Sequence, residues 1–197
     1  MRLPGGQAGF TLVELTVAMA ILLGVVATLT SALVSASNTQ ADENNRFQTQ
    51  SQARLALAKL TREIHCASQI LDSSTGNELG ATPVRGITLT LPAGCPTGGA
   101  TAVTARWCAV PNGTRFDLYR SVGASCDSTT PCPGASCVRW GESLLSGTPF
   151  SLPSVAPSGD HFPLVHVDLT VNTRTSGSGG TYELTNDIAA LNSVRSS

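Results

Sequence analysis

The chain has 197 residues, a formal net charge of −1 and only 13% charged residues. Because positive charge is not in excess, the composition argues against nucleic acid or an anionic membrane surface as a partner of the whole chain. The length suits one domain of moderate size plus an extension. Low charge with 19 Gly and 11 Pro is more typical of an exported, loop-rich β domain than of a cytosolic enzyme.

The N-terminal region divides into a short polar segment and a long apolar one. Residues 1–9 (MRLPGGQAG) are too short and too rich in Gly and Pro to form a stable element. The next 25 residues, 10–34, contain Glu14 as their only ionisable side chain. A helix of this length would be about 37 Å long, enough to cross a hydrocarbon core of about 30 Å. Because the sequence has no second such run, we expect one membrane crossing, over residues 10–35.

Glu14 needs an explanation, because an ionised acid central in a membrane helix costs about 2.5–3.5 kcal/mol. One interpretation keeps Glu14 at the wet interface, as the polar end of a signal sequence. The other gives it a positive partner at similar depth. This chain supplies such a partner only if it is cut before Phe10, which creates an α-amino group four residues from the acid. Pairing within one helix and pairing with a neighbouring copy both remain open.

The polar segment that follows continues the helical pattern. Residues 35–71 contain no Pro or Gly. Apolar residues recur at three- and four-residue spacing, and polar ones occupy the other face. We therefore expect one helix over residues 10–71, in which residues 36–72 back a folded domain. The apolar face comprises Ala53, Leu57, Leu60, Ile64, Ala67 and Leu71, and the polar face Gln52, Arg54, Lys59, Arg62 and Glu63.

Residues 73–197 are predicted to form strands and loops. Strands are expected over residues 86–94, 162–172 and 181–191, and a hairpin over 101–123. In that hairpin Asn112-Gly113 would supply the positive φ angles of a tight turn. The fold class is therefore α+β, with a long N-terminal helix, its first half transmembrane, packed against a C-terminal antiparallel sheet of about four to six strands.

All six cysteines follow the apolar segment. An even count on one side of a membrane segment indicates disulfides formed outside the cytoplasm. Nearest-neighbour pairing would join Cys95 to Cys108 and Cys132 to Cys137, leaving Cys66 for Cys126, out of fifteen connectivities. A zinc site is disfavoured, because Cys126, Cys132 and Cys137 lack a C-x2-C pair and a nearby His. We expect no metal and no cofactor.

The stretch GFTLVEL, residues 9–15, resembles the processing motif of type IV pilins and type II secretion pseudopilins. It combines Gly9 at the end of a short leader, Phe10 after the cut and Glu14 at the fifth mature position, before a long apolar run. The resemblance implies cleavage after Gly9 by a prepilin peptidase and N-methylation of Phe10. It also implies that Glu14 guides the stacking of subunits into a filament.

Residues 53–70 (ARLALAKLTREIHCASQI) resemble the helix of minor pilins and J-type minor pseudopilins. The resemblance implies a non-enzymatic minor subunit, stored as a single-pass protein of the inner membrane with its head outside the cytoplasm. Its partners would be the prepilin peptidase, other pilin or pseudopilin subunits, the inner-membrane assembly platform and, before assembly, membrane lipid. The filament would lie in the periplasm or at the cell surface.

A second pattern in the apolar segment favours assembly. Small residues recur at every fourth position, which lets helices approach closely. They are Thr16, Ala20, Gly24, Thr28, Ala32 and Ala36.

Two alternative functions remain open, and a third, an enzyme, is disfavoured. An exported soluble domain would be cut after Ala36, where VSA resembles a signal-peptidase site. A DNA-uptake (competence) pilin would share the helix and differ in the head. An enzyme is disfavoured, because the sequence has no G-x-S-x-G, H-E-x-x-H or P-loop motif. His166 and Asp168 share a strand face near Asp160 and His161, which we interpret as an exposed polar face.

Overall fold

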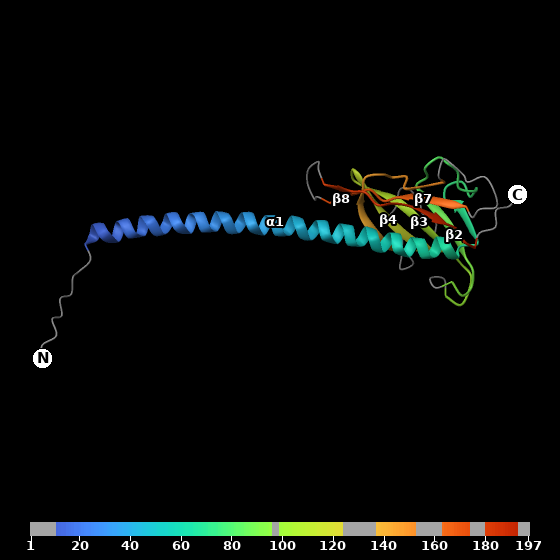
Figure 1. Ribbon diagram of the computed structural model, residues 1–197, viewed down its shortest axis with the longest axis horizontal. Coiled ribbons are helices and arrows are strands. Elements are labelled where there is room, and N and C mark those ends of the chain that lie inside the picture. The colour runs from blue at the N-terminus through green and yellow to red at the C-terminus, as the bar shows by residue number, and fades with distance from the viewer. Residues whose placement is uncertain (1–10, 96–98, 124–136, 153–162, 174–179, 193–197) are drawn as a thin grey trace. The chain divides into compact units, whose positions relative to one another are not determined.

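The computed structural model describes residues 11–95, 99–123, 137–152, 163–173 and 180–192. Its contacts divide the chain into two compact units, residues 1–44 and 45–197. Figure 1 shows the fold, with labels on α1, β2, β3, β4, β7 and β8. The elements in chain order are α1 (Leu12–Cys66), β1 (Gln69–Asp72), β2 (Gly86–Leu91), β3 (Val103–Asn112), β4 (Arg115–Val122), β5 (Cys137–Leu144), β6 (Phe150–Ser151), β7 (Leu164–Asp168), β8 (Val171–Asn172), β9 (Thr181–Tyr182) and β10 (Thr185–Ala189).

Helix α1 is continuous over 55 residues. In the first unit every side chain from Thr11 to Ala41 is exposed. The hydroxyls of Thr16, Thr28 and Thr30 donate to backbone carbonyls of the preceding turn at 2.8–2.9 Å. These hydroxyls therefore need no water, which suits an apolar environment. Within the described part of the chain, α1 alone is long and apolar enough to cross a membrane, judged by length and composition.

The helix ends earlier than predicted, at Cys66 rather than Leu71. Residues 69–72 form β1, which pairs antiparallel with β2. Just before β1, the Ser68 backbone N–H and hydroxyl donate to the Thr90 carbonyl at 2.9 and 3.1 Å. The helix ends early because β2 offers hydrogen-bond partners to the backbone after Cys66. The helical spacing of apolar residues in the sequence carries no information about these partners.

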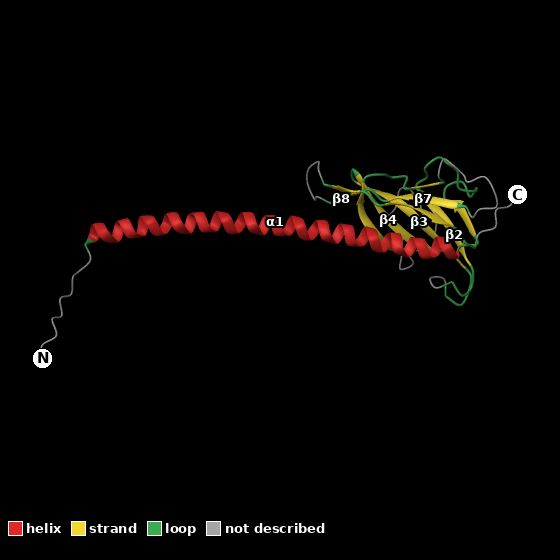
Figure 2. Ribbon diagram, in the orientation of Figure 1, coloured by secondary structure: helices red, strands yellow, loops and turns green. Residues whose placement is uncertain are grey.

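The second unit contains the C-terminal part of α1 and two antiparallel sheets (Figure 2). One has seven strands in the order β1-β2-β3-β4-β5-β8-β9, and the other has three in the order β10-β7-β6. The α+β class is confirmed, but the expected single sheet of four to six strands is wrong. The predicted strand over residues 162–172 is divided, because β7 pairs with β6 and β10 whereas β8 pairs with β5 and β9.

The predicted hairpin is β3 and β4, with a different turn from the one expected. Asn112 pairs with Arg115, so the central turn residues are Gly113 and Thr114. Gly113 has a φ of 63°, whereas Asn112 remains in the strand. A glycine at the first central position is the requirement of a type II′ turn, whose twist matches that of the strands.

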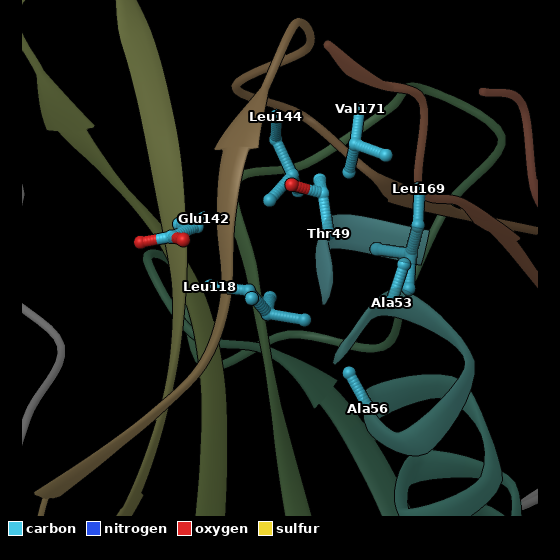
Figure 3. A pocket seen from close by; sticks show the side chains of 9 residues that line it. Thr49, Ala53, Ala56, Leu118, Glu142, Leu144, Leu169 and Val171 are labelled. Carbon is cyan, nitrogen blue, oxygen red and sulfur yellow. The ribbon is translucent and has the colours of Figure 1, made fainter. Parts of the chain in front are cut away.

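The core of the second unit lies between α1 and the sheets. Ala53 and Ala56 of α1 face side chains of β4, β5 and the β7–β8 region (Figure 3). The space between them is too small for a water molecule, so this is a packed seam and not a binding site. Of the predicted stripe, four residues are fully or almost fully buried: Ala53, Leu60, Ile64 and Ala67.

A disulfide joins Cys66, the last residue of α1, to Cys95 in the loop after β2. The nearest-neighbour pairing is therefore wrong for Cys95 with Cys108 and for Cys66 with Cys126. The register explains this, because Cys108 lies opposite Gly86, at the end of β2 away from Cys95. Cys108 and Cys137 each take part in a disulfide as well. Cys126 and Cys132 lie outside the described residues, so the Cys132–Cys137 pairing stays a prediction.

Candidate processing and assembly site

The start of α1 is fixed by a local hydrogen-bonding pattern around Thr11 and Glu14. The Glu14 backbone N–H donates to the Thr11 hydroxyl at 3.3 Å, and the Thr11 carbonyl accepts from Leu15 at 3.2 Å. Thr11 is thus the N-cap and Glu14 the third helical residue, the spacing of a capping box. An acid in the first turn also interacts favourably with the helix dipole. The sequence spacing T-x-x-E at residues 11–14 is the signal from which this contribution of Glu14 to the helix start could have been predicted.

The Glu14 side chain is exposed. It is the only ionisable side chain between Thr11 and Ala41, so no cation in this stretch can neutralise it. Gly9 and Phe10 lie outside the described residues. The pairing of Glu14 with an amino group at Phe10 therefore stays a prediction. What the described segment offers is a single acid at the N-terminal end of an exposed apolar helix.

The small residues of the apolar segment lie on the exposed surface of the helix. All six lie within α1 and are exposed. At Gly24, no atom lies within 4 Å of the position that a Cβ would take. Another helix can therefore approach the backbone closely at this point.

A buried carboxylate, Glu63, links α1 to the sheet in the second unit. It is fully buried, and accepts hydrogen bonds from Trp107 Nε1 at 2.7 Å and Arg120 Nε at 2.8 Å. Lys59 Nζ lies 3.6 Å from its Oε1. The prediction that Glu63 belongs to the polar face is wrong. Position 63 is three residues after Leu60 and shares its helix face. The strand residues that make its burial tolerable, Trp107 and Arg120, are distant in sequence.

His166 and Asp168 of β7, which were considered above as catalytic candidates, each contact a nearby residue of the same part of the fold. His166 Nδ1 lies 2.6 Å from Asp187 Oδ1 across β7 and β10. The Thr170 hydroxyl donates to Asp168 at 2.6 Å. Asp160 and His161 lie outside the described residues. Within the described ranges no three His, Cys, Asp or Glu side chains are grouped as metal ligands.

Comparison with protein families identifies the N-terminal region. Residues 5–34 match the model of the prokaryotic N-terminal methylation motif. No significant match was found among curated proteins or among solved structures. The motif is the prepilin signal of type IV pilin-like proteins, which are processed by prepilin peptidase and assemble with other pilins. Together with the apolar helix, the motif suits a membrane-anchored, pilin-like protein.

Proposed function

We propose that this chain is a minor pilin or minor pseudopilin. In this proposal residues 1–9 are a leader, residues 10–35 a transmembrane and filament-core helix, residues 36–72 a helix backing the head, and residues 73–197 a disulfide-containing head. Prepilin peptidase cuts after Gly9. The mature subunit waits in the inner membrane with its head outside the cytoplasm, and then joins a type IV pilus or type II secretion pseudopilus.

The observation that carries the proposal is the position of Glu14. It lies in the first turn of an exposed apolar helix, inside the matched motif. Cleavage after Gly9 places a new cation, the Phe10 α-amino group, four residues away. In a low-dielectric filament core an unpaired carboxylate is strongly unfavourable, whereas a paired one is not. The charge pair therefore favours addition of a subunit at a defined axial position.

The rest of the apolar segment is compatible with both the lipid bilayer and the filament core. Its exposed residues suit hydrocarbon as well as a bundle of similar helices, and its threonine hydroxyls bond to the helix backbone. Transfer from lipid to filament then exchanges one apolar surrounding for another. Close packing at small residues such as Gly24 favours the filament.

Mass spectrometry of the mature N-terminus tests the proposal. We expect a chain that begins with N-methylated Phe10. A chain that begins with Ser37 would support the exported soluble domain instead, and an uncut Met1 would contradict both. Helix α1 continues without interruption through residues 34–36, which does not favour a conventional signal-peptidase site there.

The machine that the subunit serves is a separate question with its own experiment. Deletion of the gene in the native host should abolish one of three activities: secretion of folded enzymes, pilus-dependent twitching or adhesion, or DNA uptake. We expect loss of secretion or loss of twitching or adhesion, and not of DNA uptake. The reason is that the head sequence beyond Ser73 has seven Arg against eight acids and no basic stripe. Loss of DNA uptake alone would favour the competence pilin.

A further inference from the structure

The part of α1 that packs on the sheet has a second, outward side. Its buried residues, such as Ala56 and Leu60, lie on one side of the helix. On the opposite side, at 3.6 residues per turn, lie large apolar residues that are not covered. Phe47 is 71% exposed and Leu55 is 61% exposed. We define the outer helix face as Phe47, Arg54, Leu55, Ala58, Arg62 and His65, which are all exposed.

The outer helix face carries charge of one sign. From Asn45 to Cys66 the only acid is Glu63, and it is buried against Trp107 and Arg120. The exposed ionisable residues on this face are Arg54, Arg62 and His65. The face is therefore apolar and basic, with no carboxylate of its own to neutralise the cations.

An open cleft of about 300 Å³ borders this face at Leu55. Its far wall belongs to β5, where Val138 is 50% exposed. The Trp140 Nε1 donor beside it is buried and has no hydrogen-bond partner in the described part of the chain. Arg139 adds a half-exposed cation, which also contacts Asp117 and Glu142. The cleft is lined by Gln52, Leu55, Val138, Arg139, Trp140 and Gly141.

We propose that the outer helix face and this cleft dock an acidic, amphipathic helix of a different pilin-like subunit. The inference rests on the proposed function and names the partner that this subunit takes. An apolar side chain of the partner enters the cleft between Leu55 and Val138, and its acids face Arg62 and Arg139. Helix-in-groove recognition uses this combination of apolar anchors and complementary charge.

The charge pattern argues for a different subunit and against a second copy at the same face. Two copies of the outer helix face would bring arginines against arginines, which is unfavourable. Duplex DNA and lipid fit less well. The cleft beside these cations has apolar walls at Leu55 and Val138, which a phosphate backbone would leave unfilled. A concave cleft with apolar walls receives a protruding side chain better than it receives a flat bilayer.

Site-specific photocrosslinking in cells of the native host tests the proposal on the full chain. A photoreactive phenylalanine analogue replaces Leu55 in one strain and Val138 in another. The matched control is Leu191, an apolar residue that is 50% exposed in the head. We expect adducts at positions 55 and 138, but not at 191, with one prepilin-type protein whose helix carries acids on the contacting face, identified by mass spectrometry.

Charge reversal then tests the chemistry. Arg62→Glu should reduce the adduct at position 55 by about tenfold or more, and an acid→Lys change in the partner should restore it. Adducts with the chain itself, with DNA or with lipid would overturn the proposal, as would equal labelling at positions 55, 138 and 191. The mature N-terminus and the filament fraction are measured in the same strains. A subunit that is processed and assembled without the expected adduct refutes this inference alone, whereas an unprocessed subunit refutes the proposed function.

Discussion

The Trp107 indole N–H donates to the Glu63 carboxylate across 2.7 Å, and both side chains are fully buried. Arg120 compensates the charge from β4 at 2.8 Å. The contact connects the helix to the sheet at one position along the helix axis. A buried ion pair adds little net stability over an apolar contact, but losing one partner leaves an uncompensated charge. The network therefore fixes how α1 sits on the sheet of the second unit.

Replacing Glu63 should weaken the second unit strongly. We expect Glu63→Ala to lower the free energy of unfolding by about 3–5 kcal/mol, because Arg120, whose side chain is only 12% exposed, then loses its partner. Denaturant unfolding of the full chain in detergent, followed by tryptophan fluorescence, measures the change. The control, Glu183→Ala at an exposed acid, should stay within about 0.5 kcal/mol. Equal effects of the two changes would show that the network is dispensable.

Gly86 has no room for a side chain. An added Cβ would lie 2.8 Å from the Trp107 carbonyl oxygen and 2.9 Å from Cys108 Sγ, which belongs to a disulfide. We expect Gly86→Ala to destabilise the head by about 1–3 kcal/mol through overpacking. Gly80→Ala is the matched control, because the nearest atom there is 4.0 Å away. A melting temperature equal to that of the control would contradict the prediction.

The head should lose stability in acid through Asp72. Burial tends to raise the pKa of Asp72, but hydrogen bonds from Ser74 and Thr75 outweigh this and hold the pKa below its ordinary value. The folded state thus favours the ionised carboxylate. Its contribution to the free energy of unfolding is fully present above the ordinary pKa of an aspartate and is lost as the pH falls through the lower pKa of the folded state. The difference in melting temperature between wild type and Asp72→Asn should be largest near neutral pH and shrink below about pH 4. A difference that stays constant with pH would refute this.

Substitutions at Glu14 distinguish the proposed charge pairing in assembly from capping of the helix start. Glutamine at the third helical residue preserves a capping box but removes the charge. If charge pairing guides assembly, Glu14→Gln and Glu14→Ala should both be processed normally and both fail to enter the filament. If capping is the only role, Glu14→Gln should assemble as wild type does. Immunoblots of purified filaments and of membranes measure the two fractions, with Thr11→Ala as the control for loss of the cap alone.

The N-terminal half was the more predictable part of this protein. The long apolar run and the spacing of Gly9, Phe10 and Glu14 are local in sequence, and the family match covers the same residues. The amphipathic period also located most of the buried helix face. These features could be predicted because helix formation and motif recognition depend on residues a few positions apart.

The sequence by itself determined the class of the fold, the helix and the processing motif. Only the tertiary structure decided that Glu63 is buried, that Cys66 pairs with Cys95, and that residues 162–172 divide between two sheets. Each of these depends on a partner tens of residues away, such as Trp107 for Glu63 or β10 for β7. Local patterns carry no information about such partners, because only packing of the whole domain selects the strand register and the charge that accompanies a buried acid.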